Sequence, residues 1–545
     1  MRAEDGQRAK KDAARHVAET HLLRAGTPAD TYLETLINDT LYHEQRRLER
    51  EDPRDPATRA DLAFYQRIRR EIRQAGSLEL RSLLERMARR FADEIVGNFD
   101  QRVYKITTTI VPTGLSLLLG AMSPRKLASP SSLRQTLREH IQIQGAVDHV
   151  RSLLDRGTLV VVPTHSSHLD SIALGYAVYL MGMPPLLYGA GLNLFTNPLI
   201  SFFMQNLGAY RVDRKKSAGL YKDVLKEYAI CALELGYSNL FFPGGTRSRS
   251  GAVEQKLKKG LLGTATTAYV RNLRARRSKP NLYFVPCTIS YKLVLEAETL
   301  VDDYLKEVGK SRYIIEDDEF SKPRRVLNFL SNVVSLDSRV VITFSAPLDV
   351  VGNRVDREGR SLDPRGRAVD PVAYVSRDSE PVHDEQRDAQ YTREVADAIG
   401  AAFLRDNVVM STHIVAQVML ELIRRKNPEL DLYRLLRTGG SESSFEVSEL
   451  ALEVERLVGS LRGLSGGPRL GEELEQHDAR LIVDDALRHF KTYHTQPALV
   501  RRGERVIHRD RNLLYYYANR LRGYDFERRV AHSAVGDAPW MTQSP

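Results

Sequence analysis

Two patterns of hydrophobic and polar residues follow each other along the chain, and they predict different kinds of element. In the first 145 residues, apolar residues recur at helical spacing among charged ones, as in SLELRSLLERMARRFADEIVGNF (77–99). From about residue 146, short apolar runs such as TLVVVP (158–163) and NLYFVPCTISY (281–291) alternate with helical segments. A β-branched apolar run of this length predicts a buried strand. Strands that alternate with helices predict an α/β domain.

These patterns divide the chain into five segments. We predict a helical N-terminal domain (1–145), an α/β domain (146–350), a turn-rich insertion (351–387), a helical C-terminal domain (388–529) and a disordered tail (530–545). The insertion is predicted from its Gly, Asp, Arg and Pro residues, which favour turns and hairpins. A chain of 545 residues is also too long for a single hydrophobic core.

Composition narrows the class of protein. With 42% hydrophobic and 28% charged residues, the chain is typical of a folded soluble protein, not of a collagen-like, disordered or ordinary multi-pass membrane protein. The only two cysteines, Cys231 and Cys287, support neither a disulfide framework nor a cysteine-based zinc site, and they favour a reducing compartment. No cluster has the spacing of metal ligands, so no metal is predicted. The N-terminus lacks an apolar signal core, so export is not expected.

Charged residues are unevenly distributed: one stretch is strongly basic, and two segments carry no charge. Lys and Arg exceed Asp and Glu by 80 to 70 overall, and residues 205–279 alone hold 16 basic against 5 acidic residues, a net +11. This stretch predicts an anionic partner such as phosphate or a lipid headgroup, the alternative being a solvated basic face. It lacks the aromatic interleaving of a nucleic-acid binder, so no nucleic acid is predicted. Two uncharged segments, 106–124 and 171–210, contain prolines and favour either buried core or membrane-interface segments.

A candidate catalytic pair follows the first predicted strand directly. His165 lies in the turn after that strand, and Asp170 lies in the first turn of the next predicted helix. Open α/β sheets place reactive groups at such strand ends. A carboxylate that binds one imidazole nitrogen leaves the other free to act as a general base. The alternative is a structural network at the helix N-terminus. His168 is too close to Asp170 in sequence for the two side chains to meet on a helix.

Two basic motifs suit the binding of a phosphate group. GAYRVDR (208–214) carries Arg211 and Arg214, and FFPGGTRSRSG (241–251) runs from a predicted strand into paired glycines, hydroxyls and guanidinium groups. Glycine lets the backbone approach an anion closely, and arginine offers a two-pronged donor for phosphate. The alternative is that the second motif is simply a basic turn.

Four motifs, taken in their order along the chain, resemble the four sequence blocks of the glycerolipid acyltransferases. The resemblance is closest to the glycerol-3-phosphate and dihydroxyacetone-phosphate acyltransferase branch. The motifs are HSSHLD (165–170), GAYRVDR, GGTRSRSG (244–251) and VPCTISYKLVLE (285–296). DRNLLYYYANRL (510–521) is similar to the tyrosine-rich end of the larger members. The resemblance implies an α/β fold with a central mixed sheet flanked by helices. It also implies transfer of a fatty acyl group from a thioester to the sn-1 hydroxyl of glycerol 3-phosphate, giving lysophosphatidate, the first step of phospholipid synthesis.

The resemblance also assigns residues to roles. His165 would be the general base and Asp170 the residue that orients it. The residues implied at the acceptor phosphate and its loop are Arg214, Arg247, Arg249, Gly245, Thr246 and Ser248. Val285 and Pro286 would line the acyl-donor side. The resemblance implies no cofactor, an acyl-CoA or acyl carrier protein thioester as co-substrate, and an anionic membrane surface as a partner. The protein would be a peripheral or monotopic protein on the cytoplasmic face of the cell membrane.

Two positions depart from the pattern of the family. Gly244 stands where most members have Glu, and Arg211 stands where they have an apolar residue or Phe. The missing carboxylate affects how the acceptor glycerol is held, and Glu254 is a nearby candidate to replace it. Dihydroxyacetone phosphate and lysophosphatidate are alternative acceptors. A catalytically inactive adaptor on a membrane surface is the alternative from another functional class.

Overall fold

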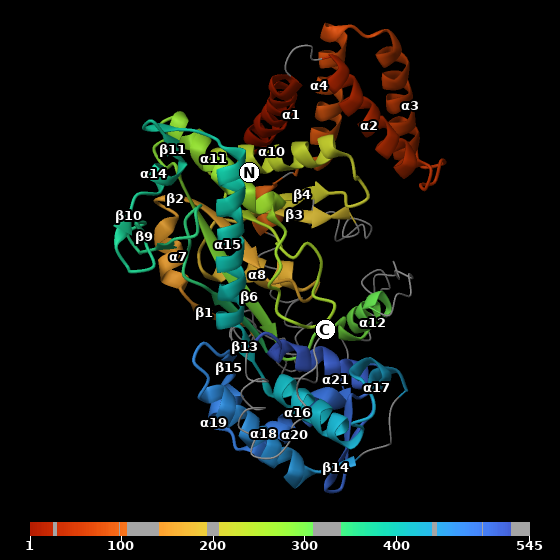
Figure 1. Ribbon diagram of the computed structural model, residues 1–545, viewed down its shortest axis with the longest axis vertical. Helices are drawn as coiled ribbons and strands as arrows, with labels where there is room; N and C mark the ends of the chain where they lie inside the picture. The colour runs from red at the N-terminus through yellow and green to blue at the C-terminus, as the bar shows by residue number, and fades with distance from the viewer. Residues whose placement is uncertain are drawn as a thin grey trace.

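Three regions follow one another along the long axis of the molecule, and the α/β domain lies between the other two (Figure 1). The computed structural model describes residues 1–25, 30–97, 99–105, 141–192, 206–308, 339–438, 444–492 and 494–524. The first uncharged segment, part of the second and the predicted disordered tail lie outside these residues. We use "N-terminal region" for residues 1–97 and "C-terminal region" for residues 411–524.

A seven-stranded mixed sheet forms the centre of the α/β domain, in the order β1-β7-β6-β2-β5-β3-β4. Only β6 and β7 pair antiparallel, so β1 and β7 run opposite to the other five strands. The strands are β1 (Ile141–Gly145), β2 (Gly157–Pro163), β3 (Leu187–Gly191), β4 (Ala209–Val212), β5 (Asn239–Leu240), β6 (Asn281–Tyr291) and β7 (Val340–Phe344). This arrangement confirms the predicted fold class.

Burial on both faces explains the apolar run that predicts β2. Successive side chains of a strand point to opposite faces of its sheet. Leu159 and Val161 belong to a core shared with the C-terminal region, whereas Val160 and Val162 belong to a core on the other face. In contrast, only the first residue of β1 is buried. That strand therefore lacks a continuous apolar run, and the sequence pattern does not predict it.

Helices cover both faces of this sheet (Figure 1). On one face, α11 packs against α10 and α15, and α15 also contacts β6. The helices of this domain and its neighbours are α7 (Val147–Leu153), α8 (Asp170–Leu180), α10 (Gly219–Glu234), α11 (Lys259–Arg274), α12 (Ala297–Val308) and α15 (Glu385–Asp406). Helix α8 begins directly after the loop that leaves β2, so it brings its first residue to the carboxyl end of the sheet.

The N-terminal region is helical, and it packs against one end of the α/β domain through α1 and α4. Its helices are α1 (Ala3–Ala25), α2 (Asp30–Leu48), α3 (Pro56–Glu71), the short 3₁₀ turn η1 (Ile72–Gln74) and α4 (Ser77–Ile95). Apolar residues of α1, α2 and α4 share one core with α10 and with Tyr210 of β4. The second motif, which contains β4, is therefore attached to this region.

The insertion and the C-terminal region contain short strands as well as helices. The insertion forms a small sheet of β8 (Arg354–Val355), β9 (Ser361–Leu362) and β10 (Ala368–Val369), helix α14 (Pro371–Val375), and a hairpin of β11 (Ser376–Arg377) and β12 (Glu380–Pro381). The C-terminal helices are α16 (Ser411–Lys426), α17 (Leu432–Thr438), α18 (Val447–Arg462), α19 (Glu472–Gln476), α20 (Ala479–Thr492), α21 (Arg511–Ala518) and the 3₁₀ turn η5 (Asn519–Leu521). Two further sheets pair β14 (Ser444–Glu446), β17 (Arg505–His508) and β16 (Leu499–Arg502), and β13 (Val408–Val409) with β15 (Arg469–Leu470). Strands of two to four residues are too short for period-two patterning, so the sequence does not predict them.

Within the described part of the chain, none of the helices is both long enough and apolar enough to span a bilayer.

Candidate active site

The carboxylate of Asp170 lies at the end of β2 and is fixed by four hydrogen bonds. Its Oδ2 accepts from His165 Nδ1 at 2.8 Å and from the backbone N–H groups of Ser166 and Ser167 at 2.7 and 2.9 Å. Its Oδ1 accepts from the hydroxyl of Tyr291 at 2.6 Å. The side chain is wholly buried. The same carboxylate therefore forms both the catalytic pair and the helix N-terminal network that the sequence left as alternatives.

The remaining ring nitrogen of His165 is available for chemistry. Because Nδ1 donates to a carboxylate, the neutral imidazole carries its lone pair on Nε2. Among the described residues, none makes a hydrogen bond to Nε2. The ring stacks on Phe242 with centroids 4.0 Å apart, and the side chain is 13% exposed. A histidine held in this way can accept a proton from a group that enters beside it.

The loop of the third motif is bound directly to the backbone of this histidine. Ser248 donates its N–H to the carbonyl oxygen of His165 at 2.7 Å, and its hydroxyl donates to the carbonyl of Ala252 at 2.7 Å. Gly245 has φ +77°, and a Cβ there would lie 2.6–2.8 Å from atoms of the Lys258 side chain. The positive φ favours glycine at that position, and any larger residue there would also have to displace the end of the Lys258 side chain.

Glu296, at the end of the fourth motif, links three motifs. Its Oε2 accepts from the Ser167 hydroxyl and its Oε1 from the N–H of His168, both at 2.9 Å. Oε1 also lies 3.6 Å from Nη1 of Arg247. The sequence did not single out this residue, because a lone carboxylate after an apolar strand carries no signal of its own. In the structure, it fixes the direction of one of the predicted phosphate-binding arginines.

The structure brings Arg214 and Arg247 together, although they come from different motifs. Partial loss of hydration and the charge of Arg247 hold the pKa of Arg214 below its usual value. Within the described residues, Arg214 has no ion pair or hydrogen bond. Arg249 is paired with Glu307 of α12 at 2.9 Å. Two neighbouring guanidinium groups, of which one has no acidic partner, favour the binding of an anion.

A cavity of about 430 Å³ opens beside Arg247 and Arg249, and neither Arg214 nor His165 is among the residues that line it. Its lining is basic on several sides and includes Arg247, Arg249, Lys256 and Arg522, with Tyr304 of α12. Residues that line it from the third-motif loop are Gly244, Thr246, Ser248 and Ser250. The volume fits a small organic phosphate well, and the lining offers both cations and hydroxyl donors.

A larger cavity of about 750 Å³ lies between β1 and the C-terminal region, but it contains none of the motif residues. Its arginines already have partners: Arg339 pairs with Glu472 at 3.1 Å, and Arg469 pairs with Asp406 at 2.7 Å. We therefore place the candidate active site at the smaller cavity.

Val285 and Pro286 lie in β6, in register with β2. Val285 is fully buried in the core, and the backbone carbonyl of Pro286 accepts from the N–H of Ser345 at 2.9 Å. Neither residue lines the basic cavity. Their assignment to the acyl-donor side stays a prediction.

The end of the C-terminal region also contacts the site. Asn519 Nδ2 donates to the carbonyl of Ser250 at 2.8 Å, and a Cβ on Gly251 would lie 2.1 Å from the carbonyl oxygen of Tyr516. Arg520 is buried and donates from Nη2 to the carbonyl of Ile289 at 2.9 Å. The tyrosine-rich motif thus packs against the third-motif loop, about 270 residues away in the sequence.

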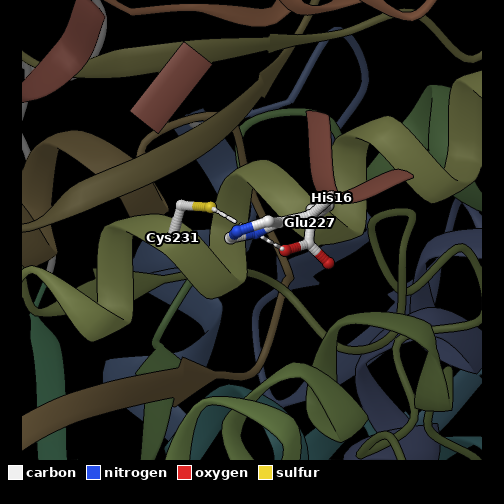
Figure 2. A group of neighbouring side chains, drawn as sticks. All are labelled: His16, Glu227 and Cys231. Carbon is white, nitrogen blue, oxygen red and sulfur yellow. Dashed lines mark hydrogen bonds and ion pairs between the residues drawn. The ribbon is translucent and has the colours of Figure 1, made fainter. Parts of the chain in front are cut away.

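One cluster away from the motifs has the residue types of a metal site. His16 Nδ1 lies 2.9 Å from Oε1 of Glu227, and Cys231 Sγ lies 3.9 Å from the same nitrogen (Figure 2). However, the guanidinium of Arg271 binds both oxygens of Glu227. Burial and Glu227 also raise the pKa of the Cys231 thiol, which opposes the thiolate that a metal requires. We interpret the cluster as an ionic contact that joins α1, α10 and α11.

Comparison with known proteins now adds to this geometry. Residues 140–290, which contain the sheet from β1 to β6 together with the first three motifs, match the model of the family described as Acyltransferase. These residues are an acyltransferase domain. The matched range contains His165, Asp170, Arg214 and Arg247, and the match confirms the predicted family; the roles of these residues stay predictions.

Relatives of this acyltransferase domain carry the name glycerol-3-phosphate acyltransferase. The protein of Aeromonas hydrophila subsp. hydrophila is 31% identical over 288 residues, which cover 52% of this chain and 31% of that protein. The protein of Haemophilus ducreyi is 33% identical over 222 residues, 40% of this chain and 25% of its own. The protein of Pseudomonas aeruginosa is 27% identical over 252 residues, which cover 45% of this chain and 27% of that protein. The chain therefore spans less than a third of the length of these relatives.

Proposed function

We propose that this protein transfers a fatty acyl group from a thioester to a hydroxyl of glycerol 3-phosphate. One observation carries the proposal: the oriented His165 is hydrogen-bonded through its backbone to the loop that carries Arg247, and the charge of Arg247 acts on Arg214, which has no acidic partner among the described residues. The names of the relatives supply the acceptor. We further propose the sn-1 hydroxyl as the site of acylation, lysophosphatidate as the product, and acyl-CoA or acyl carrier protein as the donor.

The arrangement suits direct attack by the acceptor alcohol. As the hydroxyl oxygen attacks the thioester carbonyl, its proton passes to Nε2 of His165, and Asp170 stabilises the imidazolium through Nδ1–H. When the tetrahedral intermediate collapses, the carbon–sulfur bond breaks and the thiolate takes the proton from the imidazolium. Arg214 and Arg247 hold the acceptor phosphate, so that the hydroxyl is oriented before the reaction begins. No covalent enzyme intermediate is needed.

Replacing the base tests this mechanism. In His165→Ala, we expect acyl transfer to fall by about 10²–10⁴-fold with an unchanged circular dichroism spectrum. His383→Ala is a matched control, because His383 also pairs with an aspartate, Asp388, at 2.5 Å but lies in none of the motifs. The assay supplies labelled glycerol 3-phosphate with each thioester and separates the products by chromatography. Near-normal turnover in His165→Ala would exclude the mechanism, and an inactive wild-type protein would favour the adaptor.

We also propose that the protein acts at the cytoplasmic surface of a membrane, because its product carries an acyl chain. Two observations support this: the net charge of +11 in residues 205–279 and a set of exposed apolar side chains beside the first motif. Ile172 and Tyr179 lie seven residues apart on α8, hence on one face, and both are exposed, as is Leu192 after β3. High salt should release the protein from membranes only partly, and detergent should release it fully. Complete release by salt would show that the attachment is electrostatic and needs no apolar insertion.

A further inference from the structure

The carboxyl group of Glu254 fills the space beside Gly244. A Cβ built on Gly244 would lie 2.3, 2.5 and 2.8 Å from Oε1, Cδ and Oε2 of Glu254, and these are its three nearest neighbours. The φ of Gly244 is not in the left-handed region, so the backbone itself would accept another residue. The end of the Glu254 side chain, ten residues later, thus occupies the place that a side chain of residue 244 would take, and a larger residue there would have to displace it.

The carboxyl group of Glu254 is buried at the wall of the basic cavity, yet it lacks a full set of partners. Its Oε2 is buried and has no hydrogen-bond partner among the described residues. The backbone N–H of His165 hydrogen-bonds the carboxyl group, and the charged groups that face it are Asp170 and Arg520. Other parts of the residue line the cavity beside Arg247. A buried oxygen without a partner costs stability, so its retention points to a ligand.

Glu254 is also suited to sit beside a phosphate. Burial raises the pKa of its carboxyl group to about 8, with help from Asp170, while the N–H of His165 and the charge of Arg520 act in the opposite direction. The group is therefore mostly neutral at pH 7 and does not repel an anion. A neutral carboxyl group has one O–H donor and accepting oxygens, so it can bind a hydroxyl group in either sense.

We propose that Glu254 binds the acceptor hydroxyl that is not acylated, and so supplies from a downstream position the carboxyl group that residue 244 lacks. The proposal rests on the proposed function. The phosphate lies at the arginines and the attacking hydroxyl lies at His165. Glu254 contacts the backbone of that histidine and the wall of the same cavity. The carboxyl group of Glu254 therefore lies between the histidine and the basic cavity, where a small acceptor bound at both would leave its remaining hydroxyl.

A substrate that lacks one hydroxyl tests the contact. Wild-type protein should prefer glycerol 3-phosphate to 3-hydroxypropyl phosphate by about 10–100-fold in kcat/KM, since the latter lacks the middle hydroxyl. Glu254→Ala should lower kcat/KM for glycerol 3-phosphate by about the same factor and leave the value for 3-hydroxypropyl phosphate nearly unchanged. Glu254→Gln, which keeps the shape, should retain part of the preference. Glu358→Ala removes an exposed glutamate of the insertion and serves as the control.

Moving the carboxyl group back provides a second test. Gly244→Glu alone places two side chains in one space and should be inactive or unstable. Combined with Glu254→Ala, the same change should restore the preference for glycerol 3-phosphate at least partly. If Glu254→Ala keeps the full preference for glycerol 3-phosphate, Glu254 does not bind the remaining hydroxyl. If the double variant shows no greater preference than Glu254→Ala alone, Glu254 does not take the place of a carboxyl group at residue 244. If His165→Ala removes activity while Glu254→Ala has no effect, only this inference fails. If the wild type acylates neither phosphate, the proposed function fails.

Discussion

The N-terminal and C-terminal regions pack against opposite ends of the same acyltransferase domain, but each contacts a different motif through different chemistry (Figure 1). The N-terminal region holds the loop of Arg214 through ion pairs with Lys216. The C-terminal region holds the loop of Arg247 through a hydrogen bond from Asn519, and it buries Arg520 beneath the site. The two arginines of one anion site are thus supported by parts of the chain more than 400 residues apart.

The N-terminal contact depends on a buried ammonium group. Nζ of Lys216 lies 2.7 Å from Glu94 and 3.1 Å from Glu44, and it also lies 4.8 Å from the ring centroid of Phe91. This lysine follows Arg214 by only two residues, so the ion pairs restrict where that arginine can lie. Removing these charges from water costs free energy, and their mutual attraction offsets that cost. Removing one partner therefore destabilises the protein, because it leaves a buried charge without compensation.

The C-terminal contact depends mainly on hydrogen bonds to backbone atoms. Arg520 binds the carbonyl of Ile289 and, at 3.3 Å, the hydroxyl of Ser290, and its burial lowers its own pKa. Its charge also acts on Asp170 and Glu254. The N-terminal contact therefore chiefly supports stability, whereas the C-terminal contact also places a buried positive charge that acts on the carboxyl group of Glu254.

The largest effect on stability is expected from Lys216→Met. Glu44, which is fully buried, and Glu94, which is 27% exposed, would keep only Arg47 and Arg90 as cations, so the free energy of unfolding should fall by about 3 kcal/mol. Urea unfolding measures the loss, and hydrogen exchange should show it first in α2 and α4. Lys226→Met is the control, because Lys226 is 45% exposed and its ion pair with Asp223 is worth at most about 1 kcal/mol. Equal losses in the two variants would contradict the importance of the buried network.

Arg520→Met should affect catalysis more than stability. The loss of its charge-assisted hydrogen bonds costs about 1.5–3 kcal/mol. If the residues of the site shift when these bonds are lost, that energy corresponds to a fall of about 10–100-fold in kcat/KM. The loss of its positive charge should also raise the pKa of Glu254 further, so the rise of the acceptor KM at alkaline pH should move to higher pH. Arg505→Met, which removes an exposed arginine paired with Glu446, should change neither quantity. If the pH dependence of the acceptor KM is unchanged in Arg520→Met, the role of this arginine is purely structural.

These support residues show where prediction from sequence ends. His165, Asp170 and the arginines belong to motifs at strand ends, and parallel strands bring such ends together, so the site could be outlined from the sequence. Lys216 and Arg520 contact the site only because helices from distant parts of the chain pack there. No local pattern marks a buried lysine as different from its exposed neighbours.

The same limit applies to the fold. The strands around 158–163 and 281–291 are buried on both faces, and their continuous apolar runs predict them. β1 has one buried side chain and leaves no pattern, whereas β5, although only two residues long, lies in the apolar run that predicts a strand before the third motif. Glu254 was suggested by its position in the sequence, but only the structure shows that its carboxyl group lies where a side chain of residue 244 would be.

Asn519→Ala should have a smaller effect, confined to the acceptor. It removes one hydrogen bond to the carbonyl of Ser250, worth about 0.5–1.5 kcal/mol, so KM for glycerol 3-phosphate should rise about 2–10-fold. KM for the thioester and the thermal midpoint should change little. Asn512→Ala, in the helix α21 that directly precedes the 3₁₀ turn of Asn519, is the matched control because Asn512 contacts Asp302 and not the loop. A change in the thioester KM instead would place this loop on the donor side.

The smallest effect expected on activity comes with an opposite response of stability to pH at Glu227, which contacts His16 of the N-terminal region, and at Glu254, which faces Arg520 of the C-terminal region. Although burial acts against it, hydrogen bonds from His16 and Arg271 hold the pKa of Glu227 below its usual value. The stability that this contact adds is therefore present above about pH 4.3, the usual glutamate pKa, and is lost as the pH falls through the folded pKa. Glu254 has a raised pKa, so its contribution is complete below about pH 4.3 and is lost as the pH rises towards 8. Thermal midpoints measured from pH 3 to 9 should show that Glu227→Gln weakens the acid dependence and Glu254→Gln the alkaline one; the same response in both variants would contradict the assignment.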